Sequence, residues 1–193
     1  MPKDKNFLTR PDKKGLYDPD FERDSCGVGL VANVKGLPSR EIMDNAYLIN
    51  SRMDHRGGCG FEENTGDGAG ILLALPDSFF KLEAKSLDFE LPEKGEYAVG
   101  NIFLPQKINE YNICKEIVEK TLLKEGLNFI GWRKVPTNQT KANVGPAALD
   151  CQPKIEQLFV GSKGKISQDD FERKLYLCRK IFSKKLRLSL IHI

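Results

Sequence analysis

The chain has 193 residues, which is enough for one domain with a sizeable core. Its composition, 40% hydrophobic and 30% charged, is typical of a globular protein, and a net charge of +3 is too weak to indicate nucleic acid or a membrane surface as a partner. No run of about 18 apolar residues occurs, so we expect no transmembrane helix.

The cysteines do not form a recognisable framework. All five are scattered, no Cys-x-x-Cys pair occurs, and the two histidines lie far apart. We therefore expect no metal site and no disulfides. Reduced thiols are typical of the cytoplasm, which is the location we expect.

The chain opens with a polar leader that ends at a cysteine. Residues 1–25 combine three prolines with six Lys/Arg and six Asp/Glu, which argues against a secretory signal and against an organelle transit peptide. Cys26 stands directly before the apolar run Val28–Val34, which predicts a buried strand. Gly27 and Gly29 would let other backbone or a ligand approach that strand closely.

A helix and a glycine-rich segment come next. Apolar residues at helical spacing predict a helix from Ser39 to Met53, with Ser39 as its N-cap. The segments His55–Gly60 and Thr65–Gly70 follow, with six glycines within fourteen residues. Such a segment gives up side-chain packing for close backbone approach, which is typical of a ligand site or of crowded turns.

The rest of the chain predicts a mixture of strands and helices, and hence an α+β fold. We expect strands at 71–75, 96–104, 127–135 and 157–160, helices at 76–85, 108–125 and 167–182, and a loop at 137–153. Pro76 would take the first helical position of its helix, and Gly126 would end the next one.

The helix at 108–125 has the clearest amphipathic pattern. Its apolar stripe would comprise Ile113, Ile117, Val118, Leu122 and Leu123. Its solvated face would comprise Lys115, Glu116, Glu119 and Lys120.

Three chemical arrangements can be weighed from the residues alone. The glycines at 66–70 do not fit a nucleotide loop, because Ile71 stands where Gly-x-Gly-x-x-Gly requires glycine. Cys26 and His55 could form a nucleophile–base dyad, but such a pair often coexists by chance, and we favour a loop or core role for His55. Arg56 and Asp67 could form a salt bridge that holds the glycine-rich loop, brace the strand end at Cys26, or do both.

Three ordered segments together resemble one known family. Tyr17–Pro19 followed by Asp24–Gly29 resembles the maturation site of the glutamate synthase large chain. Asp54–Gly57 and Thr65–Ile71 resemble that family's version of the Arg-Gly and Asp-x-x-Gly signature of class II glutamine amidotransferases. The resemblance covers about Gly15–Phe182, and the ordered set is specific although each motif alone is modest.

The resemblance implies a fold, a maturation step and a reaction. The fold would be an N-terminal-nucleophile hydrolase of the α+β class, a four-layer αββα sandwich that is incomplete at the C-terminus. Residues 1–25 would be a propeptide, and cleavage would give Cys26 a free α-amino group as the base for its own thiol. Cys26 would be the catalytic nucleophile that attacks the side-chain amide of glutamine. The supporting residues of the site would be Gly27, Arg56, Gly57 and Asp67.

Two motifs of the family have no counterpart here. The chain contains no Asn-Gly dipeptide for the oxyanion hole and no Ser-Arg-Phe-like stretch for the glutamine α-carboxylate. Residues 26–193 would thus be the N-terminal part of the amidotransferase domain, with a tail at 184–193 that is not family-like, and we expect little or no glutamine hydrolysis from this fragment alone. Two alternatives stay open: a non-catalytic binding or regulatory fragment, and another class II amidotransferase.

The resemblance also implies partners for the whole protein. Ammonia would serve glutamate synthesis from 2-oxoglutarate, and the full-length protein would use FMN, an iron–sulfur cluster and NAD(P)H or ferredoxin, none of them held by this fragment. The expected partners are glutamine, the FMN and synthase domains of the rest of the chain, and a small reductase subunit or domain. We expect no nucleic acid and no membrane, and a plastid location only for a plant-like protein.

Overall fold

The computed structural model describes residue 15 and residues 27–53, 56–58, 62, 65–66 and 68–189. They belong to two compact units, Met1–Ile71 and Leu72–Ile193. Helices and strands alternate irregularly along the chain, which confirms the expected mixture of α and β structure.

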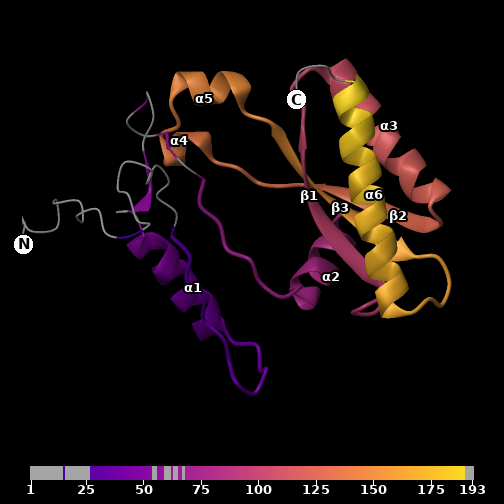
Figure 1. Ribbon diagram of the computed structural model, residues 1–193, viewed down its shortest axis with the longest axis horizontal. Coiled ribbons are helices and arrows are strands. Elements are labelled where there is room, and N and C mark those ends of the chain that lie inside the picture. The colour runs from indigo at the N-terminus through magenta and orange to yellow at the C-terminus, as the bar shows by residue number, and fades with distance from the viewer. Residues whose placement is uncertain are drawn as a thin grey trace, which may run out of the picture. The chain divides into compact units, whose positions relative to one another are not determined.

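Helix α1 (Arg40–Arg52) is the long element of the first unit, as the sequence predicts (Figure 1). It begins at Ser39, whose Oγ accepts a hydrogen bond from the backbone N–H of Ile42 at 3.3 Å. Glu41 lies in its first turn and Arg52 in its last, where each charge is favourable to the helix dipole.

The predicted strand at Val28–Val34 is wrong for the described structure. These residues are extended chain without strand pairing, and Val28 and Leu30 are 91% and 89% exposed. A strand needs a hydrogen-bonded neighbour, and no described residue pairs with this segment. The segment ends in a tight turn, in which the backbone N–H of Gly36 donates to the carbonyl of Asn33 at 2.9 Å.

The second unit contains a three-stranded antiparallel sheet with the order β1-β3-β2. Its strands are β1 (Tyr97–Leu104), β2 (Leu127–Lys134) and β3 (Lys154–Ser162), which confirms three of the predicted strands and lengthens the last. In the register, Leu158 of β3 lies between Gly100 and Trp132. A bulge between Phe129 and Gly131 shifts the register of β2.

Helices α3 (Ile108–Lys124) and α6 (Gln168–Ser189) lie together over one face of the sheet (Figure 1). The core between them and the sheet contains Val118, Leu122, Leu127, Leu158, Val160, Phe171, Cys178 and Phe182. Helix α3 ends at Gly126, which adopts a φ of +73° that glycine accommodates without strain. Helix α6 continues seven residues beyond the predicted end at Phe182.

The buried stripe of α3 differs from the predicted one. Its buried residues are Cys114, Val118, Thr121 and Leu122. Ile113 and Leu123 are 46% and 61% exposed instead, because the face that α3 buries is centred on Cys114, Val118 and Leu122. The Thr121 hydroxyl donates to the carbonyl of Ile117 at 2.7 Å, which satisfies this buried polar group.

The solvated face predicted for α3 is only half correct. Glu116 and Lys120 are exposed and pair with each other. Lys115 is instead largely buried, with its ammonium 2.9 Å from Glu156 and 4.6 Å from the centre of the Trp132 ring. Glu119 accepts a hydrogen bond from the Trp132 indole at 2.7 Å. Glu156 of β3 and Trp132 of β2 thus hold Lys115 and Glu119 against the sheet, and the periodicity of α3 alone does not reveal these partners.

Helix α2 (Asp77–Ser86) packs toward the other face of the sheet. Phe80 meets Phe159 edge to face, with 5.3 Å between the ring centres, and the Tyr97 hydroxyl donates to Asp77 at 2.8 Å. Pro76 is the N-cap rather than the first helical residue. The strand predicted at 71–75 is wrong: these residues pair with no described strand, and Leu72 is fully exposed.

The predicted loop at 137–153 contains two short helices, α4 (Gln139–Ala142) and α5 (Pro146–Cys151). The Gln106 side-chain amide donates to the carbonyls of Leu149, Asp150 and Gln152 at 3.2, 3.4 and 2.8 Å. This single side chain caps the end of α5, because the last carbonyls of a helix have no partner within the helix. Among the described helices, none is long and apolar enough to cross a bilayer.

Candidate functional site

The C-terminal turn of α1 brings Gly27 and Arg56 together. The backbone N–H of Arg56 donates to the carbonyl of Met53 at 2.8 Å, and that of Met53 donates to Asn50 at 3.2 Å. A Cβ added at Gly27 would lie 3.3 Å from Cβ of Arg56. Two residues that the sequence singles out are therefore neighbours, and Gly57 follows Arg56 as an exposed residue.

Both glycines of the segment after Cys26 are required by close packing against α1. A Cβ at Gly27 would lie 2.7 Å from Sδ of Met53. A Cβ at Gly29 would overlap the Cγ2 methyl of Ile49 and lie 3.1 Å from Cε of Met53. Close approach is found at these two positions, but the neighbours are side chains of Ile49, Met53 and Arg56 rather than the backbone or ligand that we expected.

Two of the residues expected at the site, Cys26 and Asp67, lie outside the described residues, so the Cys26 nucleophile and the Arg56–Asp67 pair stay predictions. His55, for which we favoured a loop or core role, also lies outside them. Gly68 and Gly70 have open space where a Cβ would be, so crowding is not found at these positions of the glycine-rich segment.

Met53 is the residue of this site that the sequence reasoning missed. Its side chain contacts both glycines, and its carbonyl holds Arg56. The sequence presents it only as one more apolar residue at the end of a helical stripe. Its position directly before the Asp54–Gly57 motif is the signal that could have distinguished it.

The two buried cysteines among the described residues, Cys114 and Cys178, are poor nucleophiles. Burial raises the pKa of the Cys114 thiol, with Glu110 adding to the effect, and burial likewise raises the pKa of Cys178. Cys151 is exposed, and its Sγ lies 3.1 Å from the carbonyl oxygen of Ala147. Within the described residues, no group of three or more His, Cys, Asp or Glu side chains could hold a metal ion.

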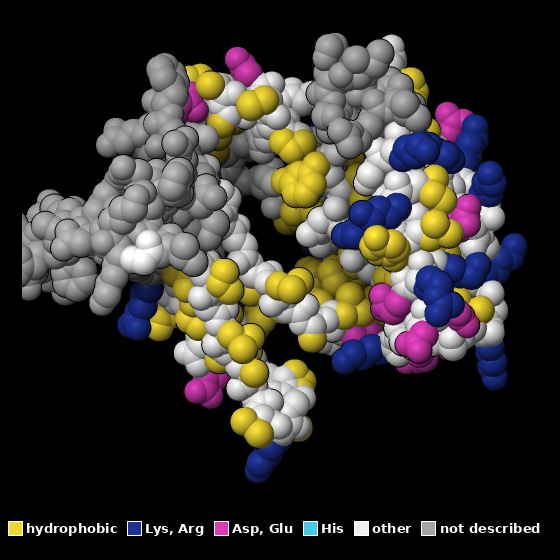
Figure 2. All heavy atoms as spheres, viewed as in Figure 1, with side chains coloured by type: hydrophobic (Ala, Val, Ile, Leu, Met, Phe, Trp, Pro, Cys, Tyr) yellow, Lys and Arg dark blue, Asp and Glu magenta, His cyan; other side chains and the backbone are white. Residues whose placement is uncertain are grey.

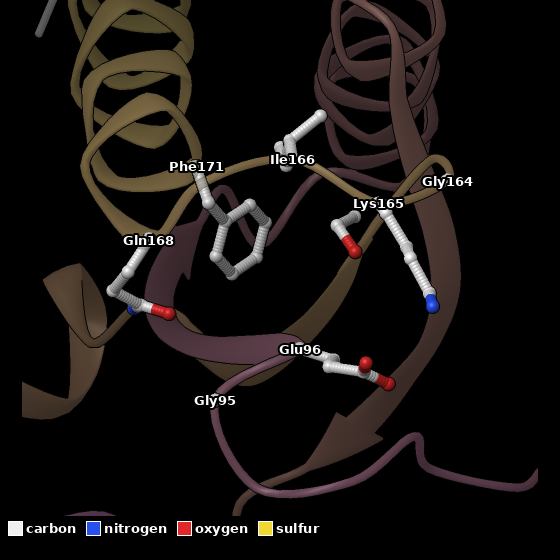
Figure 3. A pocket seen from close by; sticks show the side chains of 8 residues that line it. Gly95, Glu96, Gly164, Lys165, Ile166, Gln168 and Phe171 are labelled. Carbon is white, nitrogen blue, oxygen red and sulfur yellow. The ribbon is translucent and has the colours of Figure 1, made fainter.

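A shallow pocket of about 250 Å³ lies where β1 begins and β3 ends (Figure 3). Phe171 of α6 points into it, and Glu96, Lys165 and Gln168 stand around it with their polar ends directed to different sides. The turns at its edge use glycines with positive φ at 95 and 164. The predicted site residues that the structure describes, Gly27, Arg56 and Gly57, do not line this pocket.

Hydrophobic side chains lie at the surface around α1, whereas Lys and Arg alternate with Asp and Glu over α3 and α6 (Figure 2). In the first unit, Leu30, Val34 and Tyr47 are exposed by 89%, 103% and 67%. In the second, Glu116 with Lys120 and Arg173 with Asp170 are exposed ion pairs. Such surface pairs contribute little to stability.

Comparison with known proteins gives a consistent result. The profile of the family described as "Glutamine amidotransferases class-II" matches residues 26–191. The large chain of NADPH glutamate synthase from Bacillus subtilis is 40% identical over 171 residues, and NADH glutamate synthase from Saccharomyces cerevisiae is 42% identical over 189. Ferredoxin-dependent glutamate synthase 1 from Arabidopsis thaliana is 39% identical over 175 residues.

These alignments cover most of this chain and little of each relative. They span 88%, 93% and 91% of this chain for the bacterial, yeast and plant proteins, respectively. The chain corresponds to only 11%, 9% and 11% of the three relatives.

Proposed function

Because the chain belongs to the class II glutamine amidotransferases, we propose that it hydrolyses the side-chain amide of glutamine and supplies the ammonia for glutamate synthesis. The observation that carries this proposal is the family match, which begins at Cys26. The matched residues include Gly27 and Arg56, which are neighbours in the structure. The identity of 39–42% to three glutamate synthases supports glutamate synthesis as the use of the ammonia.

In this proposal Cys26 is the nucleophile. Its thiolate attacks the side-chain amide carbon of glutamine, the carbon–nitrogen bond breaks and ammonia leaves, and water then hydrolyses the γ-glutamyl thioester to glutamate. A thiol with a pKa of about 8.5 needs a base near neutral pH, and an α-amino group of pKa about 7.7–8.0 can serve. Cleavage of the leader at 1–25 would expose that amino group, and the start of the family match at Cys26 supports this step.

Arg56, Gly57 and Asp67 support the site in this proposal. The contact of Gly27 with the turn that carries Arg56 favours a role for the arginine beside the nucleophile. A salt bridge from Arg56 to Asp67 would hold the glycine-rich segment in the same place. The four-layer αββα sandwich is the fold that we propose for the complete domain.

The wider activity belongs to longer proteins. The names of the relatives specify NADPH, NADH and ferredoxin. We propose that a glutamate synthase containing this domain takes its electrons from one of these donors, and that FMN and the iron–sulfur cluster lie on other domains. A small reductase subunit or domain would be a further partner.

A non-catalytic binding fragment is the second candidate, because the 193 residues contain no Asn-Gly pair for an oxyanion hole. Removal of one oxyanion donor lowers the rate by about 10²–10³, so slow hydrolysis by this chain alone fits either candidate. Reactivity of Cys26 therefore distinguishes the two better than turnover does.

The test combines intact mass with an electrophilic glutamine analogue that alkylates thiols. We expect a species that begins at Cys26 and takes up one equivalent of the analogue. Cys26→Ala should abolish the adduct, and the matched control Cys151→Ala, which removes an exposed thiol, should leave it unchanged. A chain that keeps its leader, or an adduct that survives Cys26→Ala, would refute the proposal.

A further inference from the structure

The side chain of Met53 fills the space between the segment after Cys26 and the end of α1. Its Sδ faces Gly27 and its Cε faces Gly29, at 2.7 and 3.1 Å from the positions a Cβ would take. Any side chain at residue 27 would displace the thioether. Gly27 therefore packs directly against the side chains of Met53 and Arg56.

The backbone of Met53 is itself held in place. Met53 is the C-cap of α1, its N–H donates to Asn50 at 3.2 Å, and its carbonyl accepts from Arg56 at 2.8 Å. One residue thus contacts Gly27 through its side chain and Arg56 through its backbone. Movement of Met53 would alter the distance between these two.

We propose that Met53 is a positioning residue for the Cys26 nucleophile, which is bonded directly to Gly27. This inference rests on the proposed function and extends it, because it assigns to α1 the task of setting the nucleophile against Arg56. A methionine suits the task, since its unbranched side chain fills an irregular gap between two glycines. Displacement of a reacting group by about 1 Å can lower a rate about 10²-fold, so a contact outside the reacting atoms is sufficient.

The test compares Met53→Ala with Met53→Leu and with the matched control Ile49→Ala in the intact chain. Ile49 lies one turn earlier on α1 and provides the nearest atom to a Cβ at Gly29, whereas the three nearest atoms to a Cβ at Gly27 belong to Met53 and Arg56. The readouts are kcat and KM for glutamine, the rate at which iodoacetamide alkylates Cys26, mapped by mass spectrometry, and the melting temperature.

We expect Met53→Ala to lower kcat and the alkylation rate at Cys26 at least about tenfold with little change in KM, because the nucleophile and not the substrate contacts would be misplaced. Met53→Leu should recover most of the rate, since a swap of similar volume is well tolerated. Ile49→Ala should lower the melting temperature while it leaves the rate per folded molecule within about twofold. Equal losses for both alanine variants would overturn the proposal.

Gly27→Ala supplies an independent arm. Alone it should slow alkylation of Cys26, and combined with Met53→Ala it should recover part of the rate, because the smaller side chain leaves room for the added methyl group. Absence of any recovery would count against the contact. If the parent chain reacts with iodoacetamide at Cys26 but neither hydrolyses glutamine nor reacts with the glutamine analogue, the proposed function fails, while the alkylation series still decides the role of Met53.

Discussion

Glu156 is the shared acceptor of a largely buried polar cluster, and its replacement by alanine should destabilise the second unit strongly. The Lys115 ammonium donates to one oxygen of Glu156 at 2.9 Å, and the Tyr111 hydroxyl donates to the other at 2.5 Å. Glu156 is only 8% exposed. Glu156→Ala would leave the partly buried Lys115 ammonium with the Tyr111 hydroxyl as an acceptor, at 3.1 Å, and would remove the acceptor of that hydroxyl.

The magnitude follows from the two contacts and the exposure of the lysine. A hydrogen bond to a charged group contributes about 1.5–3 kcal/mol, so the two together set an upper bound of about 3–6 kcal/mol. The Lys115 side chain keeps 21% of its exposure, so water can solvate part of the stranded charge. We therefore expect a loss of about 2–4 kcal/mol in the free energy of unfolding, below the value for a fully buried pair.

Urea unfolding measures this loss directly. The fluorescence of Trp132, the single tryptophan, is a suitable probe because its ring lies 4.6 Å from the Lys115 ammonium. Glu116→Ala is the matched control on α3, since its pair with Lys120 is exposed, and it should cost less than about 1 kcal/mol. The double variant Lys115→Met with Glu156→Leu should be more stable than Glu156→Ala, because no unpaired charge remains.

One result would refute this reasoning. If Glu156→Ala cost no more than Glu116→Ala, the cluster would not hold α3 against β3. The short distances would then describe an arrangement that water replaces at no cost.

Three further predictions concern other parts of the chain. Gly29→Ala should destabilise the first unit by about 1–3 kcal/mol, measured by hydrogen exchange in α1, and Ile49→Ala should restore part of the loss because it removes the methyl group that the new Cβ would overlap. Gln106→Ala should lower the local stability at the end of α5 by about 0.5–1.5 kcal/mol and should therefore speed hydrogen exchange there. Unchanged exchange would contradict the role of Gln106 as a cap. Burial alone would lower the pKa of Lys115, but its hydrogen bonds to Glu156 and Tyr111 outweigh burial and raise the pKa above its ordinary value. The charged lysine therefore stabilises the folded state fully below about pH 10.4, and this contribution is lost as the pH rises through the pKa of the folded state. Urea unfolding at rising alkaline pH should show that loss in the parent chain and much less of it in Lys115→Met.

The helix ends that carry a local stop or cap signal were the most predictable part of the structure, whereas the end of α6 and the short helices α4 and α5 were not predicted. Ser39 caps α1 with its own hydroxyl, and Gly126 ends α3 with a positive φ, so both signals act within one turn of the residue that carries them. The strands at 97–104 and 127–134 were equally predictable, because their alternating or apolar pattern depends only on neighbouring residues in the sequence. The order of motifs around Cys26 and Arg56 gave the family.

The segment at 28–34 shows where local reading fails. Its apolar character predicts a strand, but a strand exists only when another segment satisfies its backbone, and none of the described residues does so. The contact that this segment does make, through Gly29 to Ile49 and Met53, is equally non-local.

The sequence by itself determined the local elements and the residues that carry the family resemblance, because caps, turns and periodicity depend on neighbours a few residues away. Only the tertiary structure decided that the sheet has the order β1-β3-β2, that Lys115 and Glu119 turn inward, and that Met53 lies between Gly27 and Arg56. Each of these features depends on a contact with a residue that is distant in the sequence. The free energy of burying a charge or a glycine is set by that contacting residue rather than by the neighbours in the sequence.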